Sequence, residues 1–342
     1  MALHDTTLRT RLSPRRLRFS WQRAYVAAVL AVALFVLDVV FSGGQFSSIQ
    51  ILGITNAALP LALAAVGETF VMLTNGIDLS IGSVISLSNV TVAVLAQHGL
   101  GNESILIALA VGALAGLANG LIINYARIAP LIATLATSSI FLGLALFVLP
   151  QPGGTVPGWL SGWTSGTIGS VPVAAIWLVI LMIGGWVLLR RTNYGIHIQA
   201  LGGNESSSWT AGVKVVRVRT LAYVASGTCS ALAGIFLAGL TQSGDPTIGA
   251  IYVLDAIAAV VIGGTSLVGG VGTLVGSVLG AIVLSTISAV LQVSGLSSYL
   301  QYIVTGGIVI GALLVQGMWS KRQVAVGRTP RHISATVSGG DL

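Results

Sequence analysis

The sequence has little charge and almost no cysteine. Only 7% of its 342 residues are charged, whereas a soluble domain is about 25% charged. A single cysteine, Cys229, excludes disulfide bonds within the chain, and its place in an apolar run predicts a small buried hydrophobic side chain. The four histidines all fall in tails or loops, at His4, His98, His197 and His332. We therefore expect neither a soluble domain nor a metal site.

Motifs for nucleotide binding and catalysis are also missing. No Walker P-loop occurs, so ATP and Mg²⁺ would have to bind to another chain. The stretch GGVGTLVG at 269–276 is not a dinucleotide fingerprint, because it follows no strand and opens an apolar helix. Serine, histidine and aspartate do not come together within the apolar runs as a nucleophilic set requires. The sequence predicts neither an enzyme nor a cofactor bound by this chain.

Long apolar runs make up most of the chain, which is 54% hydrophobic with a mean hydropathy of +0.94. Runs of about 20 residues can each cross a bilayer core of about 30 Å, and the strict alternation of a β-barrel is absent. The first run lacks an Ala-x-Ala cleavage pattern, which favours an anchor over a signal peptide. The sequence predicts an all-α polytopic membrane protein with about ten transmembrane helices. The expected spans are 24–41, 53–74, 83–96, 105–123, 131–149, 173–189, 220–240, two within 254–293 separated by a glycine-rich turn at 263–272, and 299–315.

The basic residues indicate the orientation of these spans. Of the sixteen, six lie in the tail 1–23, one is Arg127, five lie in the loop 190–219 and four lie in the tail 317–342. Lys and Arg accumulate on the cytoplasmic side of membrane proteins, so both termini are expected inside, on either side of one transmembrane domain, 24–316. The same rule accounts for the net charge of +7 without a nucleic-acid partner.

Polar residues within and beside the second expected span are candidates for a translocation path. They are Glu68, Asn75, Asp78 and Ser80, since ionisable groups inside a membrane are costly and usually face the bundle interior or a water-filled path. The alternatives are a buried hydrogen-bonded carboxyl at Glu68, and a helix cap at Asp78 with help from Ser80. The stretch 75–83, NGIDLSIGS, suits either a cytoplasmic turn or a break in a helix at membrane depth.

The 44 glycines recur in small-xxx-small spacing. This spacing lets helix backbones approach closely, so we expect the glycines to pack helices against one another. Two such series are Gly112, Gly116, Gly120 and Gly272, Gly276, Gly280.

Four stretches, at 66–90, 200–213, 254–281 and 297–315, resemble the permease subunits of ribose-type ABC sugar importers. The resemblance is collinear from about residue 50 to about residue 316. It implies a fold similar to the ten-span permeases of vitamin B12-type importers, in the inner membrane of a bacterium. It also implies three protein partners: a cytoplasmic ATP-binding subunit, a periplasmic sugar-binding protein, and a second permease subunit that is identical or different.

The resemblance further implies a short coupling helix within 200–213 that contacts the ATP-binding subunit. The residues that match the family pattern there are Gly202, Gly203, Asn204, Glu205 and Gly212. Ser206 and Ser207 stand where the family commonly has paired alanines. Serine is a weaker helix former than alanine, so we expect the helix to start a residue or two later.

The outer loops 151–172 and 241–252 contain no Lys or Arg. We expect them to meet the binding protein through Trp159, Trp163 and backbone groups, with Asp245 and Glu103 facing basic residues of that partner.

The predicted function is import of a monosaccharide, polyol or related small polar solute by alternating access, driven by ATP on the partner subunit. The alternative is an ion-coupled secondary transporter, in which Glu68 and Asp78 would be the membrane carboxylates.

Overall fold

The structure is a computed structural model that describes residues 14–41, 47–294, 300, 303–304, 306–307, 310–311 and 314. The tail 317–342 and most of the expected span 299–315 therefore lie outside the described residues, as does the start of the tail 1–23. In chain order the elements are α1 (Pro14–Phe41), α2 (Ser48–Leu73), α3 (Ile81–Gln97), α4 (Glu103–Tyr125), α5 (Pro130–Val148), α6 (Gly158–Ser165), β1 (Thr167–Ile168), β2 (Val171–Pro172), α7 (Val173–Arg191), α8 (Asn193–Gly203), α9 (Glu205–Thr210), α10 (Val215–Thr241), α11 (Tyr252–Ile262) and α12 (Leu274–Val293).

Six helices in the described part of the chain are long and apolar enough to cross a membrane: α2, α4, α5, α7, α10 and α12. Shorter apolar helices lie at Ala27–Val40 within α1, at α3 and at α11. The protein is thus an all-α membrane protein, as the composition predicts. The glycine-rich break expected at 263–272 is present between α11 and α12. Helix α11 has only 11 residues and is therefore about 16 Å long, roughly half of a bilayer core.

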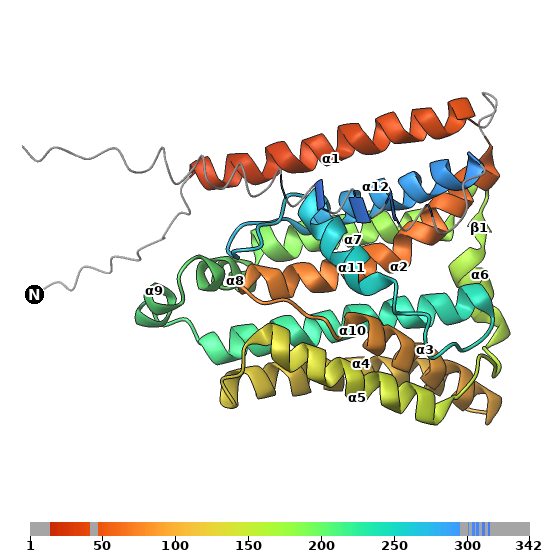
Figure 1. Cartoon of the computed structure of the whole chain (residues 1–342), viewed down its shortest axis with the longest axis horizontal. Coiled ribbons are helices and arrows are strands. Elements are labelled where there is room, and N and C mark those ends of the chain that lie inside the picture. The colour runs from red at the N-terminus through yellow and green to blue at the C-terminus, as the bar shows by residue number, and fades with distance from the viewer. Residues whose placement is uncertain are drawn as a thin grey trace, which may run out of the picture.

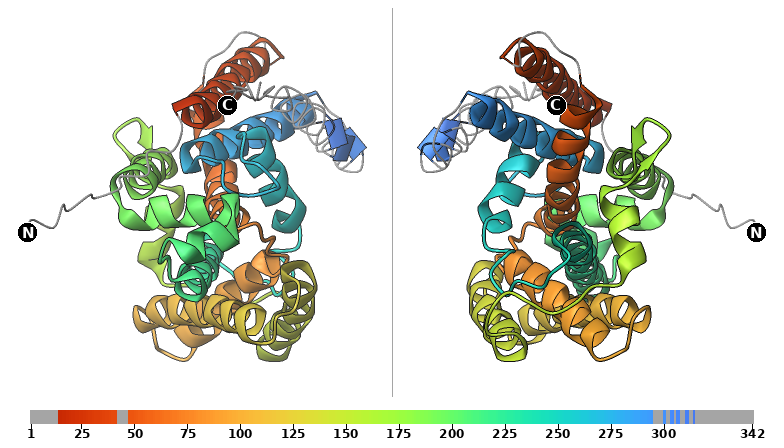
Figure 2. Two further views of the ribbon diagram at one scale, coloured as in Figure 1. Left: turned by 90° about the vertical axis from the view of Figure 1, so that its left-hand side faces the viewer. Right: turned by 90° about the vertical axis from the view of Figure 1, so that its right-hand side faces the viewer.

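Helix α2 lies at the centre of the bundle. Every residue from Ala58 to Leu73 is buried, because α10, α11, α12 and α7 pack around it. The end-on views in Figure 2 show α2 between α1 and α12 on one side and α4 and α5 on the other. A helix covered on all sides carries no hydrophilic face, which explains the nearly continuous apolar sequence of α2 up to Glu68.

The glycines at 112, 116 and 120 pack α4 against α10, which confirms the predicted role of this series. A Cβ atom added to Gly120 would lie 2.8 Å from the Cα atom of Thr220, and one added to Gly116 would lie 2.8 Å from the carbonyl carbon of Tyr223. In the second series Gly280 contacts the Ala259 backbone of α11, and Gly276 contacts the backbone of Gly263, the C-cap of that helix. Side chains at these positions would force the paired helices apart. Gly272 lies before α12 and meets the Thr265 side chain, so it does not pack two helices together.

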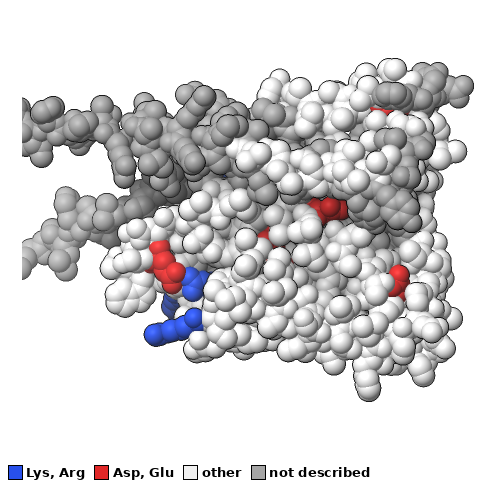
Figure 3. Space-filling model, viewed as in Figure 1, with Lys and Arg blue, Asp and Glu red and all other residues white. Residues whose placement is uncertain are grey.

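The two ends of the bundle differ in charge. Helices α8 and α9 lie at one end together with the start of α1, and α6 and the β1–β2 hairpin lie at the other (Figure 1). The basic side chains that the structure describes belong to the α8–α9 end, called here the basic end, and Figure 3 shows some of them gathered there. They are Arg127, Arg190, Arg191, Lys214, Arg217 and Arg219.

We expect Gly116→Val to destabilise the protein by about 1–3 kcal/mol or more, because its side chain would overlap the α10 backbone. Gly143→Val in α5 is the matched control, since a Cβ there meets nothing within 4 Å. The measurement is the thermal unfolding midpoint of both variants in detergent. An equal loss in the two variants would contradict the assigned packing.

Candidate functional site

The chain turns back on itself after α2. Thr74 ends the helix, and Asn75 takes a left-handed conformation with φ of 63°. The backbone N–H of Asp78 then donates to both carboxyl oxygens of Glu68, at 3.3 and 3.2 Å. Because Glu68 lies more than a turn before the end of α2, residues 76–80 run back beside that helix. Gly76, Asp78 and Ser80 are buried, so this segment is a break enclosed by helices and not a solvent-exposed turn.

Asp78 is the centre of a buried hydrogen-bond network. Its Oδ1 accepts from the backbone N–H and the hydroxyl of Ser80, at 3.0 and 2.6 Å. Its Oδ2 accepts from the hydroxyl of Ser226 in α10, at 2.8 Å. Both carboxyl oxygens of Asp78 therefore accept hydrogen bonds, as a polar group buried in an apolar bundle requires.

The network continues into α4 and α5. The amide of Asn119 donates to the Ser80 hydroxyl at 2.7 Å, and the hydroxyl of Thr137 donates to Asn119 Oδ1 at 2.6 Å. Thr134 Oγ1 accepts from the backbone N–H of Leu79 at 3.1 Å. One polar cluster therefore connects α2, the break, α10, α4 and α5. Sequence reasoning missed Asn119 and Ser226, because small polar residues on apolar helices carry no signal of a distant partner.

Three of the four candidate path residues belong to this network. Glu68, Asp78 and Ser80 are each at most 2% exposed, so in this conformation they stabilise the interior of the chain. Asn75 differs, because its side chain is exposed and lines a cavity of about 980 Å³ at the basic end. A role in a translocation path stays a prediction for all four residues.

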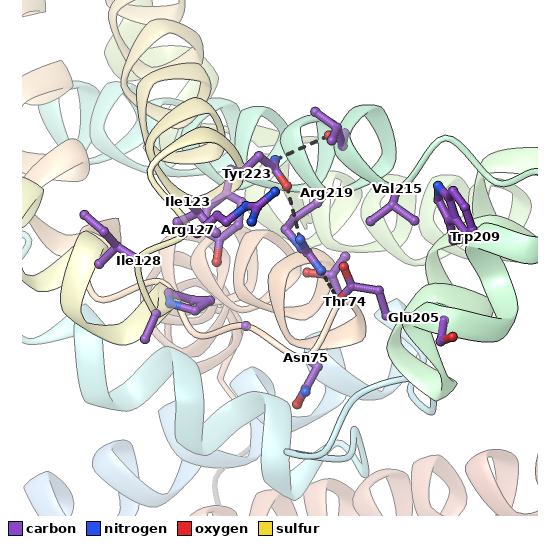
Figure 4. A pocket seen from close by; sticks show the side chains of 16 residues that line it. Thr74, Asn75, Ile123, Arg127, Ile128, Glu205, Trp209, Val215, Arg219 and Tyr223 are labelled. Atoms are coloured by element: carbon purple, nitrogen blue, oxygen red, sulfur yellow. Dashed lines mark hydrogen bonds and ion pairs between the residues drawn. The ribbon is translucent and has the colours of Figure 1, made fainter.

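The cavity brings Asn75 together with the expected coupling segment. Its walls include Glu205 and Trp209 of α9, Arg219 of α10 and Arg127 from the α4–α5 link (Figure 4). The end of α2 and the coupling segment are thus neighbours in space, although about 130 residues separate them in sequence.

The expected coupling segment forms two short helices, α8 and α9, with Asn204 between them. Asn204 is the N-cap of α9, and its Oδ1 accepts from the backbone N–H of Ser207 at 2.8 Å. The helix begins at Glu205 immediately after this cap. Ser206 and Ser207 therefore lie in its first turn and do not delay its start, contrary to the expectation.

The two glycines of this segment that the structure constrains have different roles. Gly212 has φ of 81° and ends α9, where the N–H groups of Gly212 and Val213 donate to the carbonyls of Trp209 and Ser208. This is a Schellman motif, which favours glycine. Gly202 packs directly against the Leu73 carbonyl at the end of α2. Gly203, Asn204 and Glu205 are exposed and are available to a partner.

Glu205 also forms an ion pair within the chain. Its Oε2 lies 2.6 Å from Nη2 of Arg219, with the two side chains 58% and 18% exposed. Nη1 of Arg219 donates to Asn124 Oδ1 in α4 at 3.1 Å. Arg219 therefore joins α9 to both α10 and α4. Sequence reasoning missed this ion pair. The positive-inside rule explains only why Arg219 lies on this side of the membrane, and no periodic spacing in the sequence relates it to Glu205.

Helix α8 is attached to α10 by a half-buried tyrosine. The Tyr194 hydroxyl donates to the Val218 carbonyl at 3.4 Å, and burial raises the pKa of this phenol. The group therefore remains a neutral hydrogen-bond donor at physiological pH.

The opposite end presents the expected aromatic surface. Trp159 and Trp163 of α6 are exposed, and Trp159 Nε1 donates to Asn102 Oδ1 at 2.8 Å. Gly153 and Gly244 pair through two backbone hydrogen bonds, at 2.9 and 2.8 Å, and so connect the two expected outer loops. Glu103 is exposed, whereas the Asp245 carboxylate already accepts from Thr247.

No group of three or more His, Cys, Asp or Glu side chains within the described residues is arranged to hold a metal ion.

Comparison with known proteins identifies the family of the chain. The family described as "Branched-chain amino acid transport system / permease component" matches residues 50–313. The chain belongs to this permease family. The match covers both the buried network and the coupling segment, and it confirms the resemblance seen in the sequence. No solved structure gives a significant match to the permease.

Several curated relatives of this permease are named for the solute that they import. It is 39% identical over 293 residues to the ribose import permease protein of Bacillus subtilis (strain 168), covering 83% of this chain and 90% of the relative. It is 34% identical over 303 residues to the Escherichia coli (strain K12) ribose import permease protein, covering 86% and 94%. It is also 34% identical over 327 residues to the galactofuranose transporter permease protein of the same strain, covering 92% and 94%.

We expect Asp78→Ala to destabilise the permease by about 1–3 kcal/mol for each of the donors that it leaves unpaired, measured by thermal unfolding in detergent. Asp78→Asn keeps an acceptor oxygen for Ser80 and should lose less. Glu103→Ala, an exposed acidic control, should change stability by no more than about 0.5 kcal/mol. Native stability of Asp78→Ala would contradict a structural role for the network, and a stable Asp78→Asn that cannot transport would favour a role in the path.

Proposed function

We propose that this permease is the membrane-spanning subunit of an ATP-driven importer for a monosaccharide or a related small polar solute. The observation that carries the proposal is its identity of 39%, over 83% of the chain, with a protein named as a ribose import permease. The relatives are named for ribose and galactofuranose, which supports a small polyhydroxy solute. ATP and Mg²⁺ bind to a separate cytoplasmic subunit. The permease itself lies in the inner membrane of a bacterium.

The proposed topology has ten spans with both termini in the cytoplasm, as in vitamin B12-type permeases. Helix α11 is too short to span alone, so the proposal combines it with the preceding segment 243–251. That segment descends along α3, where the backbone N–H groups of Asp245 and Gly249 donate to Asn89 Oδ1 at 2.7 Å and Ser86 Oγ at 3.0 Å. Non-helical backbone can lie at membrane depth when protein surrounds and pairs it.

The basic end is the proposed docking face for the ATP-binding subunit. Gly203, Asn204 and Glu205 are exposed at the junction of α8 and α9, and Gly202 connects this junction to the end of α2. Movement of the junction would therefore reach α2 through Gly202, and α10 and α4 through Arg219.

The opposite end is the proposed face for the solute-binding protein, with Trp159 and Trp163 as its exposed aromatic contacts. A second permease subunit completes the translocation path. Helix α5 suits that interface, because it packs against few elements of its own chain and exposes a series of apolar side chains. They are Leu131, Ile132, Leu135, Ile140, Leu142, Leu144, Leu146 and Phe147.

Reconstitution tests the energy source. We expect uptake in proteoliposomes to require the ATP-binding subunit, the binding protein and ATP, and to persist when ionophores collapse the H⁺ and Na⁺ gradients. Uptake that needs an ion gradient and no ATP would instead establish the ion-coupled alternative, with Glu68 and Asp78 as its carboxylates.

A charge exchange tests the coupling ion pair. Glu205→Arg alone should strongly reduce solute-stimulated ATP hydrolysis, because it places two cations together and breaks the connection of α9 to α10. The double variant Glu205→Arg with Arg219→Glu restores an ion pair of reversed polarity. It should recover much of the ATP hydrolysis if the Glu205–Arg219 contact within the chain is required. If the double variant stays as impaired as Glu205→Arg, then Glu205 acts by direct contact with the ATP-binding subunit. Arg127→Glu, a charge reversal in the same cavity, is the control.

A further inference from the structure

A second groove lies at the basic end, on the outer side of α4 and α10. It has a volume of about 670 Å³ and lies between the end of α4, the link 212–214 and the first turns of α10. It adjoins the cavity at Glu205, and Trp209 contributes to both. The proposed docking face for the ATP-binding subunit is centred on Gly203, Asn204 and Glu205, and it assigns no role to the cations of this groove.

The floor of the groove is apolar. Leu121 of α4 and Val216 and Leu221 of α10 line it and are partly exposed. Helix α10 has 27 residues and is about 40 Å long, so it is longer than a bilayer core of about 30 Å. Its first turns carry Arg217 and Arg219, and we expect these charges to lie at the membrane surface and the apolar floor to lie at the level of the lipid chains.

The rim of the groove is cationic. Lys214, the N-cap of α10, and Arg217 in the first turn of that helix both line it. Both are exposed, and neither forms an ion pair or a hydrogen bond through its side chain with any residue that the structure describes. No acidic residue lines the groove. In contrast, the nearby Arg219 is paired with Glu205.

Two aromatic side chains flank the cations. Tyr125 and Trp209 are 75% and 72% exposed, although both are large and amphipathic. Tyrosine and tryptophan favour the level of the lipid headgroups, where the ring is apolar and the polar atom is hydrated. Their exposure is therefore consistent with a groove that opens at the membrane surface.

We propose that this groove binds an anionic phospholipid. Lys214 and Arg217 hold the phosphate of the headgroup, Tyr125 and Trp209 flank it, and an acyl chain lies along Leu121 and Leu221. Paired cations above an apolar floor fit this ligand, since basic pockets between membrane helices bind anionic headgroups. A protein partner would account for the two cations but not for the apolar floor beneath them, whereas a phospholipid accounts for both. The inference requires a membrane protein, and it does not depend on the transported solute.

The test uses the full-length permease in nanodiscs of phosphatidylcholine with increasing amounts of brominated phosphatidylglycerol. Bromine quenches a nearby tryptophan, and Trp209→Phe identifies the component of the fluorescence that belongs to the groove. We expect saturable quenching of that component in the unmodified permease. The double variant Lys214→Gln with Arg217→Gln should raise the amount of phosphatidylglycerol needed for half-saturation roughly 10- to 30-fold. Arg127→Gln, which removes a cation of the adjacent cavity, should leave it unchanged.

Equal quenching by brominated phosphatidylcholine would overturn the proposal, since it would show no preference for an anionic headgroup. Unchanged phosphatidylglycerol binding in the double variant would also overturn it. If that variant instead loses binding of the ATP-binding subunit, the surface belongs to the protein partner. Failure of ATP-driven uptake would affect only the proposed transport function, because lipid binding is measured without the other subunits.

Discussion

A carboxyl group inside a membrane bundle must find its hydrogen-bond partners within the protein, and this constraint organises the interior of the permease. Glu68 and Asp78 satisfy it together, because the Asp78 backbone pairs with Glu68 while the Asp78 carboxylate accepts from Ser80 and Ser226. The chain can meet these distances only by leaving α2 at Thr74 and running back beside it. That return leads into α3, and the hydrogen bonds of Asn119 and Thr137 connect it to α4 and α5.

Close backbone contact brings the functional ends of several elements to one place. Gly202 lies against Leu73, and the backbone N–H of Gly270 donates to the Leu73 carbonyl at 3.1 Å. The expected coupling segment, the end of α2 and the α11–α12 turn therefore meet without intervening side chains. Because such contacts leave no compliant side chain between the backbones, displacement of α8 would displace α2 directly. The carboxyl network lies just over a turn away from this junction.

The sequence predicts the larger elements well, because hydropathy and charge act residue by residue. The long apolar helices, the basic end, the glycine packing of α4 on α10 and the break at 263–272 all follow from local pattern. The features that sequence reasoning missed depend on hydrogen bonds between segments that lie far apart in the sequence. The 40-residue run 254–293 reads as two full spans, but α11 is a short helix preceded by a segment whose hydrogen bonds go to Ser86 and Asn89 in α3. Those pairings have no signal in hydropathy.

The basic residues show the same difference between what a local pattern predicts and what distant partners decide. The positive-inside rule treats Arg127, Lys214, Arg217 and Arg219 as equivalent, yet the structure separates them by what they face. Arg219 is turned inward to Glu205 and Asn124 and connects helices, whereas Lys214 and Arg217 are turned outward above an apolar groove. Removal of Glu205 would leave Arg219 without its ion pair, whereas Lys214 and Arg217 have no such partner among the described residues. The same class of residue therefore serves different roles, because the surroundings of each cation, and not its charge alone, decide what it contacts.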